Sequence, residues 1–141
     1  MKKLQYVAYL LVFCLTVIYG CKKTSNSDSS PNKTIELGSC VPVTGGSLPI
    51  ICFESVIAES RCPTGGQCIW EGYAAIKLSI KSDAGITQYF SLSTLPYANA
   101  SIPPNDITIS GYHIKLVNLL PYPGVNSPNH ETSKVELQIT R

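Results

Sequence analysis

Four cysteines in the body of the chain have the type and spacing to form covalent cross-links: Cys40, Cys52, Cys62 and Cys68. In an exported chain of this size, an even set of thiols predicts two disulfide bonds, with three possible connectivities. Cys40 and Cys52 are equidistant from Gly46, in a glycine-rich segment typical of a hairpin turn, so that folding there places them opposite each other. Cys62 and Cys68 bracket residues 63–67, a loop able to close on itself. Local geometry therefore favours the pairs Cys40–Cys52 and Cys62–Cys68.

A metal site is the alternative use of the second pair of cysteines. Cys62 and Cys68 together with His113 and His130 would supply four zinc ligands. Structural zinc sites usually space paired ligands two to four residues apart, and the two cysteines are further apart than that. An oxidising compartment also competes for the thiols. We therefore expect disulfides, and neither a metal nor a cofactor.

A fifth cysteine, Cys21, follows a segment with the features of an export signal. Lys2 and Lys3 are followed by an apolar stretch from Leu4 to Tyr19, which is shorter than the ~20 residues that span a bilayer. The residues Val17-Ile18-Tyr19-Gly20-Cys21 resemble the bacterial lipoprotein box, in which the Cys thiolate accepts a diacylglycerol. We expect cleavage after residue 20, acylation of Cys21 (palmitate or similar chains) and stable attachment to membrane lipid.

Residues 22–33 contain no large apolar side chain and are rich in Ser, Asn and Lys, as in a flexible tether. Residue 22 is Lys and not the Asp that would indicate inner-membrane retention, which favours the outer membrane of the cell envelope. Lys2 and Lys3 lie in the segment expected to be removed, so the mature chain has nine basic and nine acidic residues. A chain of net charge zero has no electrostatic footprint for nucleic acid.

From Thr34 onward the chain shows period-two alternation of apolar and polar side chains. The clearest segments are 69–81, where Trp70 begins an apolar face, and 133–140. Further strands are expected at 34–37, 50–58, 86–93, 107–110 and 112–120, with tight turns at 82–85 and at Gly111. About seven antiparallel strands predict a monomeric all-β domain over residues 34–141. An immunoglobulin-like β-sandwich is the first choice and a small β-barrel the alternative.

Two long loops differ from the tight turns. Residues 94–106 and 121–131 are rich in Pro and Asn and contain Tyr97, Tyr122 and His130. Loops of this length in a compact domain are often functional and are otherwise mobile surface. Tyr97, Tyr122 and His130 are therefore the candidate ligand-binding residues.

Two stretches of the chain resemble a family of small exported bacterial proteins, many of which are lipoproteins of Bacteroidetes-like bacteria. The first stretch runs from Phe53 through Glu59-Ser60-Arg61-Cys62-Pro63 to Cys68-Ile69-Trp70-Glu71-Gly72. The second comprises residues 111–116 and 120–123. The resemblance implies an exported, anchored domain and supplies no catalytic residue. In physical terms, Trp70 is expected in the core, and Arg61 beside Glu59 and Glu71 suggests a structural ion pair.

Catalytic patterns are weak. The mature chain has two histidines, of which His113 alternates to the same side as Lys115, and no nucleophile-elbow or phosphate-loop motif is present. A hydrolase is therefore a minor alternative, and we expect a protein that is not an enzyme. The sequence favours an anchored domain that binds an unidentified protein or glycan. A structural component of an envelope assembly is the second possibility.

Overall fold

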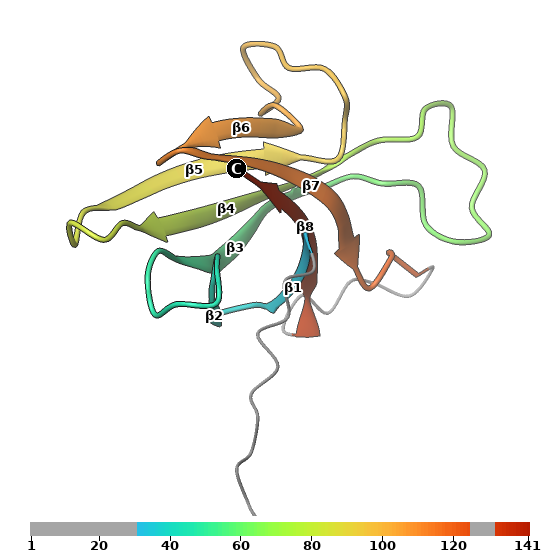
Figure 1. The fold of residues 1–141 in the computed structure, drawn as a ribbon. Helices are drawn as coiled ribbons and strands as arrows, with labels where there is room; N and C mark the ends of the chain where they lie inside the picture. Colours follow the sequence, from blue (N-terminus) through green and yellow to red (C-terminus); the bar gives the residue numbers. More distant parts are fainter. Residues whose placement is uncertain (1–30, 125–131) are drawn as a thin grey trace, which may run out of the picture.

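The computed structural model describes residues 31–124 and 132–141, which form two antiparallel β-sheets packed face to face (Figure 1). The strands are β1 (Asn32–Glu36), β2 (Cys40–Pro42), β3 (Ile50–Glu59), β4 (Ala74–Lys81), β5 (Thr87–Ser93), β6 (Asp106–Ile109), β7 (Tyr112–Leu120) and β8 (Lys134–Thr140). One sheet has the order β1-β8-β7-β6 and the other β2-β3-β4-β5. The predicted β-sandwich is thus confirmed, and the described strands form no closed barrel.

The core lies between the two sheets, and period-two alternation determines which side chains enter it. In β8, Val135, Leu137 and Ile139 are buried, whereas Lys134 and Gln138 are exposed. The opposite sheet contributes a second apolar face from β3 and β4. The largest fully buried side chains are Phe53, Ile35, Ile51, Ile76, Leu78, Ile80, Leu92, Ile114, Leu116, Leu119, Leu137 and Val135. Removal of this apolar surface from water is the main stabilising contribution to the fold.

The tight turns lie where the sequence predicts them. The turn between β4 and β5 closes with the Gly85 amide donating to the Ser82 carbonyl, and Gly85 has φ +77°. Ser110 and Gly111, with φ of 52° and 78°, join β6 to β7 in a two-residue connection of the kind that suits the twist of a hairpin. Cys40 and Cys52 face each other directly in the β2–β3 ladder.

The described residues contain eight strands, in agreement with the expected number of about seven; the additional strand is the three-residue β2, which is too short to show periodicity in the sequence. Two strand boundaries need correction. The strand expected from residue 69 begins only at Ala74, although the alternation of residues 69–73 continues that of β4 without a break. In addition, β1 already includes Asn32 and Lys33, which the sequence analysis placed in the tether.

Three loops adjoin at one end of the sandwich. The connection between β3 and β4, residues 60–73, projects away from the sheets as the light-green loop of Figure 1. Residues 94–105 connect β5 to β6 and cross from one sheet to the other. Residues 121–124 follow β7. The candidate site is built from these loops.

Candidate functional site

The loop between β3 and β4 is held as a narrow extended hairpin. The amide of Ser60 donates to the carbonyl of Tyr73 at 2.8 Å, and the amide of Cys62 donates to the carbonyl of Glu71 at 2.9 Å. The Cys62–Cys68 disulfide closes the outer part of the loop, as the sequence predicts. Backbone hydrogen bonds and the disulfide therefore join the two arms of the loop, and these links, rather than packing in the core, position the residues between Cys68 and Tyr73.

Gly72 permits the two arms to approach each other. Its φ is +66°, a conformation that L side chains rarely adopt. A Cβ atom at this position would lie 1.8 Å from the carbonyl oxygen of Ser60. Only glycine is therefore compatible with this close approach of the backbone.

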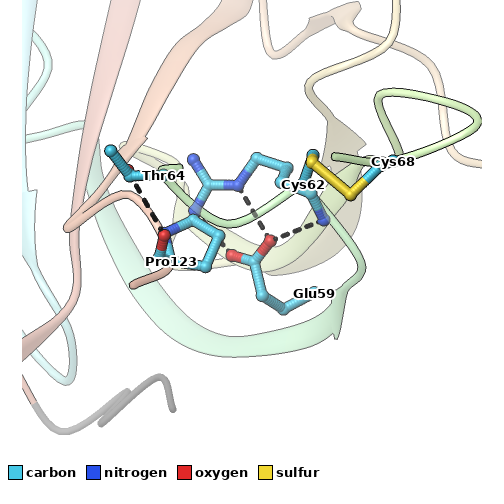
Figure 2. Close-up of a disulfide and its surroundings, with 6 residues drawn as sticks. Glu59, Cys62, Thr64, Cys68 and Pro123 are labelled. Carbon is cyan, nitrogen blue, oxygen red and sulfur yellow. Dashed lines mark hydrogen bonds and ion pairs between the residues drawn. A yellow bond between two sulfur atoms is a disulfide. The ribbon is translucent and has the colours of Figure 1, made fainter. Parts of the chain in front are cut away.

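Arg61 fastens the hairpin to the other sheet. Its Nε donates to Glu59 Oε1 at 2.8 Å, and a second guanidinium nitrogen pairs with Glu59 Oε2; the two side chains are 5% and 8% exposed. The remaining nitrogen donates to the carbonyl of Leu119 in β7 at 2.7 Å. The Glu59 carboxylate faces this guanidinium, and Figure 2 shows Glu59 near the Cys62–Cys68 disulfide. The pairing of Arg61 with Glu59 is confirmed, whereas Glu71 is not one of its partners among the described residues.

A second contact joins the tip of the loop to the segment after β7. The amide of Thr64 donates to the carbonyl of Pro123 at 3.0 Å, and the Thr64 hydroxyl lies 3.5 Å from the same oxygen (Figure 2). The side chain of Asn105 performs a similar role for the loop of residues 94–105. Its Nδ2 donates to the carbonyl of Ser93 in one sheet at 2.8 Å and to the carbonyl of Leu116 in the other at 2.9 Å. The loops at this end are thus fixed to both sheets.

These loops enclose a cleft of about 440 Å³, which we call the aromatic cleft. Its apolar lining comes from Trp70, Gly72, Tyr73, Leu95, Tyr97 and Ile102. Ser60 and Glu71 provide its polar groups. The buried Leu95 belongs to one wall, whereas Trp70 and Tyr97 are 82% and 59% exposed. The cleft is therefore an open hollow with two accessible aromatic rings.

The position of Trp70 contradicts the prediction that this residue packs in the core. Its ring is 82% exposed, and the neighbouring Ile69 is fully exposed. The left-handed conformation of Gly72 interrupts the extended backbone just before β4, so that residues 69–70 leave the plane of the sheet. Trp70 therefore faces the cleft instead of the core.

A second, smaller hollow of about 190 Å³ continues the aromatic cleft through shared lining residues Glu71, Gly72 and Leu95. It also contains Arg61 and Tyr122, with the guanidinium carbon 4.6 Å from the centre of the Tyr122 ring. Charged Arg61 is compensated there by Glu59 and the carbonyls that it contacts. This hollow is polar, whereas the first is mainly apolar.

The structure describes two of the three residues that the sequence predicts as ligand-binding residues. Tyr97 lines the aromatic cleft and Tyr122 lines the adjoining hollow, so the structure places both at the same end of the sandwich. His130 lies outside the described residues, as does the candidate lipidation site Cys21. Sequence reasoning missed Trp70 and Tyr73 as cleft residues. The available signal was the Gly72 that follows Trp70, since glycine within a strand pattern often marks a break or a close backbone approach.

The Ser60 hydroxyl in the cleft is hydrogen-bonded to the backbone, and His113 lies outside the cleft. The Ser60 hydroxyl donates to the Tyr73 carbonyl and accepts from the Tyr73 amide, both at 3.1 Å. His113 lies on the exposed side of β7, 3.5 Å from Asp106 Oδ2, and lines neither hollow.

Cys62 and Cys68 are bonded to each other, so the alternative zinc site does not form. No group of three or more His, Cys, Asp or Glu side chains in residues 31–124 and 132–141 is arranged to hold a metal ion. The same ranges contain no helix suited to crossing a membrane.

Comparison of the chain with protein-family models, with curated proteins and with solved structures gave no match.

Proposed function

We propose that this chain is a lipid-anchored protein of the bacterial cell envelope whose β-sandwich binds a ligand in the aromatic cleft without transforming it. The observation that carries the proposal is the concave hollow with exposed Trp70 and Tyr97 rings. A ligand-binding domain should present a concave aromatic site, whereas an assembly component should present a flat apolar patch or an unprotected strand edge.

Large exposed aromatic rings suit binding because their desolvation is favourable. Trp and Tyr are the residue types most enriched among those that dominate binding energy. In the free protein most of the surface of Trp70 is exposed to water. A ligand that covers the ring would remove this apolar surface from water.

The loop that presents Trp70 is fixed before any ligand arrives. The Cys62–Cys68 disulfide, the Arg61–Glu59 pair and the contact between Thr64 and Pro123 each restrict it. A pre-organised site loses little conformational entropy on binding, which favours affinity. The arrangement therefore supports recognition by a rigid surface.

The hydrogen bonds of the Ser60 hydroxyl support a binding role without catalysis. Ser60 exchanges hydrogen bonds with the backbone of Tyr73, and no histidine lines the cleft. A nucleophilic serine needs an adjacent base that takes its proton. Ser60 lacks that partner among the described residues.

Membrane attachment is proposed from the sequence. Acylation of Cys21 would anchor the domain, as a monomer, to the outer membrane. The test is incorporation of labelled palmitate by the full chain and by two variants, Cys21→Ser and Cys14→Ser. Loss of label in the first variant alone supports the anchor, and equal labelling of both contradicts it.

Binding can be followed through Trp70, which is the only tryptophan of the chain. We suggest titrating the full-length protein in detergent with cellobiose and with phenol, a neutral sugar and an aromatic alcohol. The expected result is a change in Trp70 emission that Tyr97→Leu weakens and Tyr89→Leu leaves intact. Tyr89 is a matched control because it is similarly exposed, at 62%, but lies in β5 and lines neither hollow.

A role in an envelope assembly is the second candidate, and one observation favours it. β5 is an edge strand that carries the exposed Tyr89, and Ile86 just before it is 60% exposed. Exposed edges of this kind can pair with a strand of a partner protein. A partner strand paired with β5 would protect the amides of β5 from hydrogen exchange and leave Trp70 emission unchanged, and this result would replace the first function by the second.

A further inference from the structure

The tyrosines of the described residues divide into two groups according to what lies over their rings. Arg61 lies over Tyr122 at 4.6 Å, Lys77 over Tyr89 at 4.9 Å, and Arg141 over Tyr112 at 5.8 Å from the ring centre. These distances are in the range in which a cation is attracted to the negative face of an aromatic ring.

The other two tyrosines in residues 31–124 and 132–141 are Tyr73 and Tyr97. Both line the aromatic cleft, and neither they nor Trp70 have a Lys or Arg over the ring within those residues. The cleft thus contains the two tyrosines and the tryptophan of the described residues whose rings have no described Lys or Arg over them.

The side chains that line the cleft carry negative charge and no positive charge. Glu71 is its one charged lining residue, and the lining contains no Lys, Arg or His. Among the described residues the Glu71 carboxylate has no hydrogen-bond or ion-pair partner. Arg61, in the adjoining hollow, is neutralised by Glu59. The cleft therefore combines three aromatic rings with one uncompensated negative charge.

We propose that the aromatic cleft binds the cationic head of an alkylated ammonium compound, with the aromatic rings around the alkyl groups and Glu71 facing the charge. This inference rests on the proposed binding function and names the chemical class of the ligand. An open cleft lined by aromatic rings and a carboxylate complements a quaternary ammonium group electrostatically. It disfavours phosphate and other anions, because their charge would face Glu71 and the negative faces of the rings.

The apolar lining selects alkylated ammonium over the bare ammonium of lysine. Leu95 and Ile102 contribute hydrocarbon surface and no hydrogen-bonding side-chain atom. A bare ammonium is compact and strongly hydrated, with three donors that require acceptors. Methyl groups replace those donors with apolar surface that Leu95 and Ile102 can cover.

The test compares choline with 3,3-dimethylbutan-1-ol, which has the same shape and no charge. Each compound is titrated into the full-length protein in detergent, with Trp70 emission and calorimetry as readouts. A cation–ring contact at an exposed site contributes roughly two- to fivefold in affinity. With three rings and a carboxylate, we expect choline to bind at least about tenfold more tightly than the neutral compound.

Two pairs of variants locate the site. Glu71→Gln should weaken choline binding about three- to tenfold and leave the weak binding of the neutral compound unchanged, whereas Asp83→Asn should change neither. Asp83 is a matched control because it is an exposed carboxylate in the turn between β4 and β5. Tyr97→Leu should weaken choline binding, whereas Tyr89→Leu should not. Circular dichroism of every variant shows whether the fold is retained.

The outcomes separate this inference from the proposed function. Equal affinity for choline and its neutral analogue, or binding of cellobiose or phenol without choline, overturns the cationic ligand and leaves the binding function intact. No effect of any of the four compounds on Trp70 overturns both.

Free and lipid-borne choline are distinguished by vesicles. Because the proposed anchor would hold the full-length protein on either vesicle, the readout is Trp70 emission and not association. A change in emission in phosphatidylcholine vesicles and not in phosphatidylglycerol vesicles, reduced by Glu71→Gln, assigns the site to a lipid headgroup. Binding of free choline alone assigns it to a soluble compound.

Discussion

Replacement of Gly72 by alanine should destabilise the domain far more than the same replacement at Gly85. Both glycines have a positive φ, +66° and +77°. At Gly85 an added Cβ atom meets nothing within 4 Å, whereas at Gly72 it would lie 1.8 Å from the Ser60 oxygen and 2.5 Å from the Ser60 carbonyl carbon. The comparison therefore separates the conformational cost of the substitution from its steric cost.

The magnitudes follow from the two contributions. A left-handed conformation costs an alanine about 1–2 kcal/mol, and this cost applies to both variants. At Gly72 the arms of the loop must also separate, which breaks the backbone hydrogen bonds Ser60–Tyr73 and Cys62–Glu71. At ~0.5–1.5 kcal/mol for each bond, Gly72→Ala should cost about 2–5 kcal/mol and Gly85→Ala about 1–2 kcal/mol.

Urea unfolding of both full-length variants, followed by far-ultraviolet circular dichroism, measures the difference in the free energy of unfolding. Thermal unfolding provides a second readout, because 1 kcal/mol corresponds to roughly 4–8 °C for a domain of about this size. Amide hydrogen exchange at Ser60 and Cys62 reports the separation of the arms directly. Equal destabilisation by both substitutions, with unchanged exchange at these amides, would show that the close approach at Gly72 has no energetic role.

Three further changes test the loop and the surface of the sandwich. Arg61→Met removes the cation that pairs with the buried Glu59 carboxylate, which keeps only its bond from the amide of residue 61, and it removes the donor to the Leu119 carbonyl. We therefore expect a loss of about 3–5 kcal/mol in urea unfolding, and a loss below ~1 kcal/mol would contradict the role of the ion pair. The double variant Cys62→Ser, Cys68→Ser should have a free energy of unfolding about 2–3 kcal/mol lower than the wild type. Because Trp70 is already exposed, the wavelength of its emission maximum should not change, and a blue shift would contradict this expectation. The Lys134 ammonium lowers the pKa of the Glu36 carboxyl through a hydrogen bond and through its charge. The resulting stabilisation is present above the pKa that Glu36 has in the unfolded chain and is lost as the pH falls through its pKa in the folded chain. Acid titration of the Glu36→Gln variant should therefore show a smaller loss of stability than that of the wild type.

The sequence was sufficient for the features that depend on local pattern. Alternation in residues 133–140 predicted which side chains of β8 enter the core, and the position of Gly46 predicted that Cys40 and Cys52 face each other. The pairing of Arg61 with Glu59 could also be predicted, because the two residues lie near each other along the chain. Each of these predictions required only the geometry of a strand or a turn.

The position of Trp70 could not be predicted in the same way. Period two places residues 70 and 74 on one face, and nothing in the residue types shows that Gly72 has a positive φ. That conformation depends on the approach of Ser60 and on the link between Arg61 and the other sheet, which are tertiary contacts. The aromatic cleft was therefore only partly predictable: Tyr97 was identified from its loop, whereas Trp70 was assigned to the core.

The pairing of β1 with β8 determines when the domain can complete its fold during synthesis. Of the eight strands in residues 31–124 and 132–141, β1 leaves the ribosome first and β8 last, yet they are neighbours in one sheet, with Asn32 opposite Gln138 and Glu36 opposite Lys134. At a synthesis rate of roughly 5–20 residues per second, β1 waits several seconds for its partner. Until β8 emerges, β1 and β7 both lack the strand that lies between them. The sheet that contains β1, β7 and β8 thus remains incomplete until translation has passed residue 140.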